Sequence, residues 1–106
     1  MEYKKRIYIS GAITNDPAYR EHFARAEKLL KQHGYIPVNP VTIGEKAVKL
    51  KYENPGYADF MRADIKALCE CDGIFYLPSS KDSKGSQVER AVAQSLNLLV
   101  VEIHGV

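Results

Sequence analysis

Tryptophan is absent from the sequence, and cysteine and histidine are scarce, with two cysteines and three histidines in 106 residues. Cys69 and Cys71 are two residues apart and have no second Cys or His pair that would complete a tetrahedral zinc site. Their spacing, at the expected end of a helix, is also unfavourable for a disulfide. The histidines, His22, His33 and His104, lack the spacing of metal ligands. The sequence therefore predicts no metal site, no cofactor and two reduced thiols in a cytoplasmic protein.

Long runs of one charge and long apolar runs are absent as well. Fifteen Lys and Arg residues are interspersed with thirteen Asp and Glu residues, which gives a net charge of +2. Because there is no long basic run and no basic–aromatic pattern, we expect no nucleic-acid partner. The first apolar run begins at Ile7 and is broken at Gly11, so it is too short for a signal peptide or a membrane span. The sequence therefore predicts no membrane association.

The sequence does contain an alternation of short β-rich runs and helical patterns, which we interpret as a single domain spanning residues 1–106. The order βαβαβαβ predicts an α/β fold of three layers. In it, a parallel sheet of four to five strands has helices on both faces, as in Rossmann- and flavodoxin-like domains. The expected strands are 6–10, 35–38, 72–78 and 98–101, and the expected helices are 17–33, 56–71 and 86–96.

Two segments of this pattern have further implications. Residues 98–101 form a continuous apolar run, which is typical of a strand buried on both faces of a sheet. Residues 41–54 are long for a connection in so small a domain, so we interpret them as a binding loop or lid that contains a short helix at 45–50. The segment 79–85 is a polar loop.

Asp64 breaks the apolar pattern of the helix expected at 56–71. The apolar positions of that helix have offsets of 0, 3, 4, 8 and 11, and Asp64 occupies offset 7, which belongs to the same face. An unpaired buried carboxylate needs a partner, a raised pKa or a wet cleft. Asp64 is thus either a functional group in a cleft or a buried residue satisfied by the backbone or by Arg62. The apolar positions are Tyr57, Phe60, Met61, Ile65 and Leu68.

Glu89 has two possible roles. The segment Ser86–Glu89 reads as an S-x-x-E capping box, in which the glutamate only stabilises the start of a helix. A carboxylate near a helix N-terminus also stays ionised more easily, which suits a nucleophile and predicts a lowered pKa. Glu89 lies beside the apolar stripe expected to face the core, so it is placed at the edge of the buried face. That stripe consists of Val88, Ala91, Val92, Ser95 and Leu96.

Glycine, serine and lysine accumulate where parallel strands are expected to end. Gly11 follows the first strand, as glycine does where backbone approaches a ligand closely. The segment 79–86 is rich in hydroxyls and lysine and leads into a helix, so a phosphate or sugar can be accommodated there, although such loops are more often solvated turns. It is not a P-loop, and the sequence contains no GxGxxG motif.

These segments, taken in order, resemble the nucleoside 2-deoxyribosyltransferase superfamily, and most closely its small DUF4406 branch. The resemblance covers nearly the whole chain. The matching segments are Ile7–Thr14 (IYISGAIT), Gly34–Pro40 (GYIPVNP), Met61–Ile65 (MRADI), Cys71–Pro78 (CDGIFYLP) and Ser83–Glu89 (SKGSQVE) followed by Ala93.

The resemblance implies an enzyme and a set of roles. Glu89 matches the nucleophilic glutamate at the end of G-x-x-x-E, Asp64 matches the aspartate that helps to protonate the leaving base, and Tyr8 matches the tyrosine beside the nucleophile. Ser83 stands where nucleoside-monophosphate N-glycosidases carry the serine that meets the 5′-phosphate and where transferases acting on free nucleosides carry aspartate. Substrate-binding residues are expected at the strand ends and the loop before Glu89: Ser10, Gly11, Ala12, Ile13, Asn39, Ser83, Gly85 and Ser86.

The expected activity is N-glycosidic bond cleavage or 2-deoxyribosyl transfer on a nucleoside or nucleoside 5′-monophosphate. The alternative is a nucleotide-binding module of the same fold without turnover, since relatives often carry a tryptophan in the loop before the glutamate and this sequence has none. The resemblance also implies a homo-oligomer, a dimer or higher, in which a neighbouring chain closes the site. The aromatic residues of 52–57 are candidates for its interface.

Overall fold

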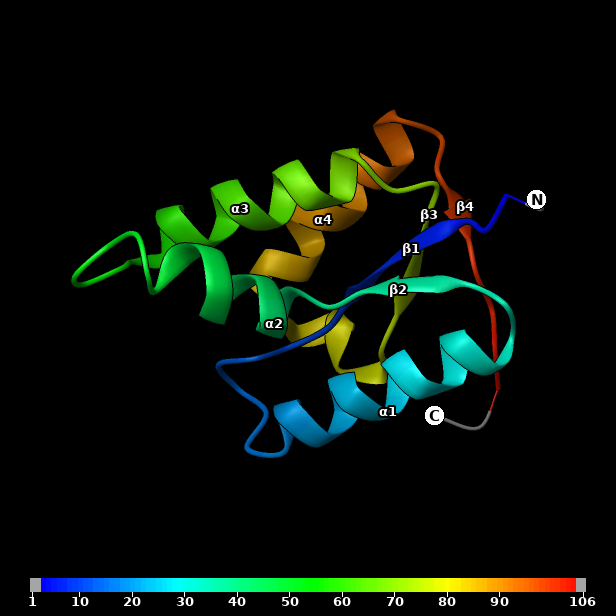
Figure 1. Cartoon of the computed structure of the whole chain (residues 1–106), viewed down its shortest axis with the longest axis horizontal. Helices are drawn as coiled ribbons and strands as arrows, with labels where there is room; N and C mark the ends of the chain where they lie inside the picture. Colours follow the sequence, from blue (N-terminus) through cyan, green and yellow to red (C-terminus); the bar gives the residue numbers. More distant parts are fainter. Residues whose placement is uncertain (1–2, 105–106) are drawn as a thin grey trace.

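The structure is a computed structural model that describes residues 3–104, in which strands and helices follow one another in the expected order (Figure 1). The strands are β1 (Arg6–Ser10), β2 (Ile36–Val38), β3 (Gly73–Tyr76) and β4 (Leu99–Val100). The α-helices are α1 (Tyr19–Gln32), α2 (Pro40–Ile43), α3 (Tyr57–Cys69) and α4 (Lys84–Ser95). A π-helical turn, η1 (Gly44–Val48), continues α2, and a 3₁₀ turn, η2 (Pro78–Asp82), precedes α4.

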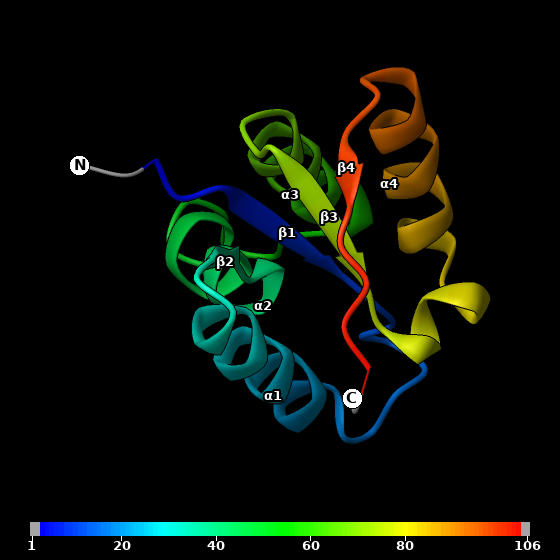
Figure 2. The ribbon, with the colours of Figure 1, turned by 90° about the vertical axis from the view of Figure 1, so that its right-hand side faces the viewer.

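The strands form one parallel sheet in the order β2-β1-β3-β4 (Figure 2). Tyr8 in the middle of β1 pairs with Val38 on one side and with Ile74 on the other. The chain runs from β1 outward to β2 and then crosses back to β3 on the opposite side of β1. The order of the strands therefore reverses between β1 and β3, and the carboxyl ends of these two strands border the crevice where ligands bind in open α/β sheets.

Two separate cores fix the helices to the two faces of the sheet. On one face, Ile7 and Ile9 pack with residues of α1, including Phe23 and Leu30. On the other face, Tyr8 and Ile74 pack with residues of α3 and α4, among them Leu68 and Ala93. This alternation along β1 is the two-residue period of a strand. The predicted α/β fold of three layers is confirmed, with four strands in the part of the chain that the structure describes.

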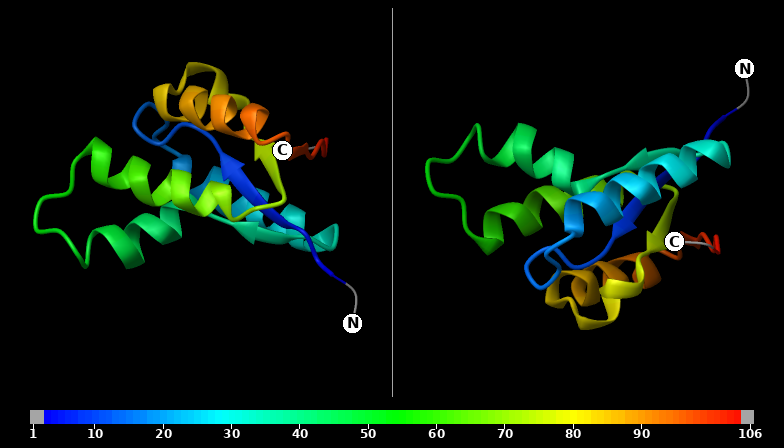
Figure 3. Two further views of the ribbon diagram at one scale, coloured as in Figure 1. Left: turned by 90° about the horizontal axis from the view of Figure 1, so that it is seen from above. Right: turned by 90° about the horizontal axis from the view of Figure 1, so that it is seen from below.

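Residues 40–69 form a helical hairpin that projects beyond the carboxyl ends of the strands (Figure 3). Its first arm is α2 with η1, and its second arm is α3. Gly44 allows the arms to approach, because a Cβ atom at this position would lie 3.2 Å from Cε1 of Phe60. The short helix expected at 45–50 thus begins earlier, at Pro40, where the side chain of Asn39 caps it by accepting a hydrogen bond from the Val41 N–H.

The C-terminal third differs from the prediction in three ways. The segment expected to be a loop contains η2, and α4 begins at Lys84 rather than Ser86. The prediction that the last strand is buried on both faces is wrong, because β4 is a short edge strand whose Leu99 and Val100 are 43% and 50% exposed. Within residues 3–104, none of the helices combines the length and apolarity needed to cross a membrane.

Candidate active site

Glu89 is held by two hydroxyl groups of β1 rather than by the start of its own helix. Its carboxylate is almost completely buried, with the residue 5% exposed. The Tyr8 hydroxyl donates to Oε2 at 2.7 Å, and the Ser10 hydroxyl donates to Oε1 at 2.8 Å. Both donors are themselves buried, Tyr8 in the middle of β1 and Ser10 at its carboxyl end. Because each carboxylate oxygen has one donor from the sheet, the orientation of the Glu89 carboxylate is fixed at the carboxyl end of β1.

The capping-box interpretation of Glu89 is therefore wrong. Ser83 is the N-cap of α4, and its Oγ accepts a hydrogen bond from the Ser86 N–H at 3.1 Å. The two serines are three residues apart, and serine is a residue type favoured at helix N-caps. With the cap at Ser83, Glu89 lies beyond the first turn of the helix, and its side chain turns toward β1 instead of its own backbone.

Asp64 is buried in the same site, on α3. Its Oδ1 is fully enclosed and receives no hydrogen bond from any residue that the structure describes. Burial raises the pKa of Asp64 from 3.8 to about 7, and the nearby charge of Glu89 adds to this rise. The alternative in which Arg62 pairs with Asp64 is wrong, because the Arg62 side chain is exposed and pairs with Asp59 instead. Its Nη1 lies 3.8 Å from Oδ1 of Asp59. Asp64 is thus a carboxyl group that binds a proton near neutral pH.

Glu89 and Tyr8 complete the electrostatics of this cluster. Burial raises the pKa of Glu89 as well, while the hydrogen bonds from Tyr8 and Ser10 oppose that rise. The lowered pKa expected from the helix N-terminus is therefore wrong, because desolvation outweighs the favourable contacts. Burial, together with the charges of Glu89 and Asp64, raises the pKa of Tyr8 well above its usual value, so Tyr8 remains a phenol that donates. Glu89 has donors that favour its ionised form, and Asp64 Oδ1 has none among residues 3–104.

Gly11 brings the loop after β1 close to the end of β3. A Cβ atom at Gly11 would lie 2.7 Å from Cδ1 and 3.0 Å from Cβ of the buried Leu77, so any larger residue would collide. The next backbone group, the Ala12 N–H, donates to Ser79 Oγ at 3.0 Å. The loop from Gly11 to Asn15 is thereby held against η2 and forms part of the surface of a cleft.

The cleft has a volume of about 560 Å³, within the range of small-molecule sites. Glu89 and Asp64 both lie on its surface, together with the loop after β1, the start of α1, the helical hairpin and the first turn of α4. Phe60 and Met61 supply an apolar wall one turn of α3 from Asp64. The lining residues at the predicted substrate-binding positions are Gly11, Ala12, Ile13, Ser83, Gly85 and Ser86.

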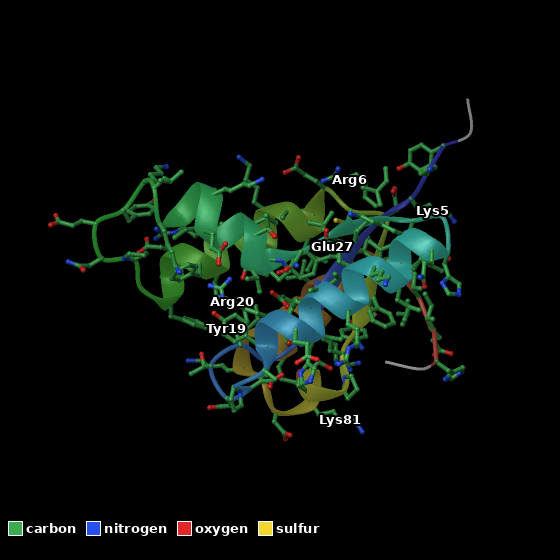
Figure 4. All side chains as sticks on the ribbon, turned by 60° about the horizontal axis from the view of Figure 1, so that its bottom comes forward. Lys5, Arg6, Tyr19, Arg20, Glu27 and Lys81 are labelled. Atoms are coloured by element: carbon green, nitrogen blue, oxygen red, sulfur yellow. The ribbon has the colours of Figure 1, made fainter. Side chains whose placement is uncertain are left out.

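Two pairs of side chains cross from the body of the protein to the helical hairpin at the cleft. Arg20 at the start of α1 forms a salt bridge with Glu45 of η1, and Figure 4 shows Arg20 and Tyr19 on the side of α1 that faces the hairpin. Lys84 of α4 lies over the ring of Tyr57, with Nζ 4.9 Å from the ring centre. These residues line the cleft, yet neither Arg20 nor Glu45 was singled out from the sequence. Their partnership depends on tertiary packing, and no local spacing indicates it.

The first turn of α4 presents polar groups to the cleft. Ser86 is buried, and its Oγ has no hydrogen-bond partner among the described residues. Ser83 and Lys84 of the same turn also line the cleft, so the N-terminal end of α4 brings two serines and one lysine to it. Such an arrangement favours an anion, because the helix dipole and the free N–H groups of the first turn carry partial positive charge.

Three predicted site residues lie outside the cleft surface. Tyr8 and Ser10 are completely buried behind Glu89, where their hydroxyls donate to its carboxylate. The Asn39 side chain also has other partners, since it caps α2 and donates to Glu27 Oε2 at 3.1 Å. Asn39 therefore positions the hairpin relative to α1 rather than facing the cleft. Within residues 3–104, no group of three or more His, Cys, Asp or Glu side chains is arranged as metal ligands would be.

Comparison with known proteins assigns the chain to a family. The model of a family described as "Domain of unknown function (DUF4406)" matches residues 5–102. The chain belongs to the DUF4406 family. This confirms the family indicated by the sequence motifs, and in this DUF4406 protein Asp64 and Glu89 from two of these motifs lie on one cleft. No curated protein matches the chain in sequence.

The fold of this DUF4406 protein is that of a known enzyme. A solved structure described as "2-desoxiribosyltransferase from Leishmania mexicana" superposes with a TM-score of 0.64 at 20% sequence identity. The match covers 92% of the DUF4406 chain and 62% of the other chain, so the DUF4406 chain spans less than two thirds of that protein. At this identity the likeness establishes the shared architecture. The reaction has to be argued from the residues of the site.

Proposed function

We propose that this DUF4406 protein cleaves the N-glycosidic bond of a nucleoside or nucleoside 5′-monophosphate, with Glu89 as the nucleophile and Asp64 as the general acid. The observation that carries the proposal is the contrast between two buried carboxyl groups in one cleft. Glu89 accepts two hydrogen bonds that favour its ionised form, whereas the pKa of Asp64 is about 7 and its Oδ1 has no donor in the described part of the chain. Burial raises the pKa of both carboxyl groups, but hydrogen bonds oppose that rise at Glu89, and a nucleophile and an acid require such a difference.

In the first step, an oxygen of Glu89 attacks C1′ of the sugar, and the bond between C1′ and the base nitrogen breaks. The electron pair of that bond goes to the base, which receives the proton of Asp64. The products are free base, an ester between C1′ and Glu89, and ionised Asp64. Positive charge that develops on the sugar is stabilised by the carboxylate, whose position is fixed by the Tyr8 and Ser10 hydroxyls.

In the second step, a nucleophile attacks C1′ and the bond between C1′ and the Glu89 oxygen breaks, which restores the carboxylate. With water as the nucleophile, Asp64 accepts its proton and the reaction is hydrolysis. With the nitrogen of a second base, the proton released from that nitrogen returns to Asp64 and the reaction is 2-deoxyribosyl transfer. In both cases Asp64 ends protonated and ready for the next cycle.

A 5′-phosphate is the substituent that the first turn of α4 favours. Ser86 Oγ is buried and has no hydrogen-bond partner among the residues that the structure describes. The Ser83 hydroxyl, whose oxygen already accepts from the Ser86 N–H, retains its own proton to donate. Lys84 adds a positive charge at the same turn. These groups support a nucleoside 5′-monophosphate over a free nucleoside, and they support hydrolysis, since the resemblance links the serine at position 83 to monophosphate N-glycosidases.

The test is to incubate the protein with ribo- and deoxyribonucleosides and their 5′-monophosphates and to follow free base by chromatography. Glu89→Gln keeps the shape of the side chain and removes the nucleophile, so base release is expected to fall by at least about 10³-fold. Glu102→Gln is the matched control, because Glu102 is an exposed glutamate outside the cleft. Ser86→Ala is expected to raise KM for the monophosphate and leave KM for the nucleoside unchanged.

Each result bears on a different part of the proposal. Base release that persists undiminished in Glu89→Gln would contradict the assignment of the nucleophile. An equal effect of Ser86→Ala on nucleoside and monophosphate would contradict the phosphate position. If nucleotides raise the melting temperature but no member of the panel releases base, the protein is a nucleotide-binding module without turnover.

A further inference from the structure

The catalytic proposal leaves one charged pair on the surface of the cleft without a role. Arg20 at the start of α1 and Glu45 of η1 form a salt bridge, and both residues line the cleft (Figure 4 labels Arg20). Their side chains are 58% and 42% exposed, and a salt bridge as exposed as this one contributes little to stability. The pair therefore stands where a bound molecule meets a guanidinium and a carboxylate together.

This pair lies across the cleft from the first turn of α4, which favours an anion. Helix α4 packs on one face of the sheet, and α1, which carries Arg20, packs on the other face. The carboxylate of Glu89, which the proposed reaction places at C1′ of the sugar, is held at the end of β1, in the sheet between these two helices. A nucleotide with its phosphate at α4 and its sugar at Glu89 therefore extends its base toward α1 and the hairpin.

Three polar groups follow one another on that side of the cleft. Asp64 is on α3, Glu45 is on η1 and Arg20 is on α1. Gly44 precedes Glu45, and a Cβ atom at Gly44 would lie 3.2 Å from Cε1 of Phe60, which is one turn of α3 from Asp64. Figures 1 and 2 both show α2, which η1 continues, between α3 and α1. Glu45 is therefore the middle group, with Asp64 on one side and Arg20 on the other.

The hydrogen-bonding capacity of these groups alternates. Protonated Asp64 donates, the ionised carboxylate of Glu45 only accepts, and the guanidinium of Arg20 only donates. Each member of the salt bridge can make more hydrogen bonds than the salt bridge uses, so both remain available to a ligand. The side of the cleft that receives the base thus presents a donor, an acceptor and a donor in that order.

We propose that Asp64, Glu45 and Arg20 together bind one edge of the substrate base and select an edge that runs acceptor, donor, acceptor. The inference rests on the proposed function, because that function places the base beside Asp64. Adenine has such an edge in N7, the 6-amino group and N1, and uracil and thymine have it in O2, N3–H and O4. N7 of a purine and O2 of a pyrimidine are also atoms at which the leaving base accepts the proton of Asp64. The substrates are then nucleotides of adenine, uracil or thymine.

The other bases have the reverse polarity at two of the three positions. Hypoxanthine and guanine present O6 and N1–H where adenine presents its amino group and N1. Cytosine presents unprotonated N3 and an amino group where uracil presents N3–H and O4. In each of these bases a lone pair faces the Glu45 carboxylate and a hydrogen faces the Arg20 guanidinium, so both side chains lose solvent without gaining a partner. A site built on hydrogen bonds discriminates strongly against such a ligand.

The test is titration calorimetry of the Glu89→Gln chain with dAMP, dIMP, dUMP and dCMP. Glu89→Gln removes the nucleophile, so the affinity is measured without bond cleavage. The Kd of dAMP is expected to be at least about 10-fold lower than that of dIMP, and the Kd of dUMP at least about 10-fold lower than that of dCMP. Deamination of the base thus weakens binding in the purine pair and strengthens it in the pyrimidine pair.

Glu45→Gln, made in the same chain, tests the middle group. The glutamine amide offers an N–H as well as an oxygen, so both Kd ratios are expected to fall below about 3-fold. Glu53→Gln is the matched control, because Glu53 is an exposed glutamate of the same hairpin outside the cleft, and it should leave both ratios unchanged. Loss of the salt bridge by itself weakens all the nucleotides alike, so the ratios report the recognition of the base.

The outcomes separate this inference from the proposed reaction. The inference is overturned if no nucleotide binds, if the members of each pair bind equally, if deamination acts in the same direction in both pairs, or if Glu45→Gln behaves like Glu53→Gln. The expected ratios without any release of base by the wild-type chain contradict the proposed reaction alone. Release of base with equal kcat/KM within each pair contradicts the base selection alone.

Discussion

The raised pKa of Asp64 predicts an unusual dependence of stability on pH, which the single change Asp64→Asn isolates. In the unfolded chain the Asp64 pKa is near 3.8, and in the folded protein it is about 7. A raised pKa means that the folded state holds the proton more tightly, so the contribution of Asp64 to stability is complete below pH 4 and is lost as pH rises to 7. Since each pKa unit corresponds to about 1.4 kcal/mol, the loss is on the order of 4 kcal/mol.

The measurement is urea unfolding of wild type and Asp64→Asn at pH 4, 6 and 8, at one protein concentration. Asparagine does not titrate, so any fixed cost of the substitution is the same at every pH. The difference in unfolding free energy between the two proteins should therefore shift by on the order of 4 kcal/mol in favour of the variant between pH 4 and pH 8. A difference that is constant across this range would refute both the burial of an ionisable Asp64 and its assignment as the acid.

Two further changes test the groups around Glu89. Tyr8→Phe removes the 2.7 Å hydrogen bond to Oε2 of Glu89, so the pKa of Glu89 should rise further. The acidic limb of the pH profile of kcat/KM should then move to higher pH. An unchanged limb would mean that Tyr8 does not lower the pKa of the carboxylate. Gly11→Ala places a Cβ 2.7 Å from Cδ1 of the buried Leu77, so it should destabilise the fold by about 1–3 kcal/mol. The measurement is the melting temperature, which should fall. An unchanged melting temperature would show that the Leu77 side chain moves to make room for the methyl group.

The sequence predicted the sheet and the position of Asp64 well, because both depend on strong local patterns. The alternation of apolar runs with helical periods is independent of tertiary detail, and it specified three layers and the order of the strands along the chain. Asp64 was detectable as a carboxylate at a core position of α3, and it is buried there. Glu89 was predicted to lie at the edge of the buried face of its helix, whereas it is fully part of that face. The difference arises because the apolar pattern of α4 predicted that the face with Val88 and Leu96 is buried.

The wrong predictions share a physical cause. A local sequence pattern offers two candidate faces or two candidate caps, and tertiary contacts decide between them. Helix α4 buries Glu89 and Ser86 because β1 offers hydroxyl donors and the cleft adjoins them, so the more apolar stripe is left outside. The apolar residues of β4 suggested burial on both faces, although that strand lies at the edge of the sheet. The close approach of Gly44 at the start of η1 to the Phe60 ring of α3 depends on tertiary packing, which no local spacing reveals.

The hydrogen bonds that hold Glu89 also determine at which stage of protein synthesis the candidate site can form. They join positions separated by 81 and 79 residues, so the two hydroxyls of β1 are made long before their acceptor. Until α4 has left the ribosome and docked, the Tyr8 and Ser10 hydroxyls have no carboxylate to which they can donate hydrogen bonds. Water has to accept these hydrogen bonds in the meantime. A fragment that stops short of α4 lacks Glu89, so the docking of α4 completes both the polar core of the sheet and the proposed pair of catalytic carboxyl groups.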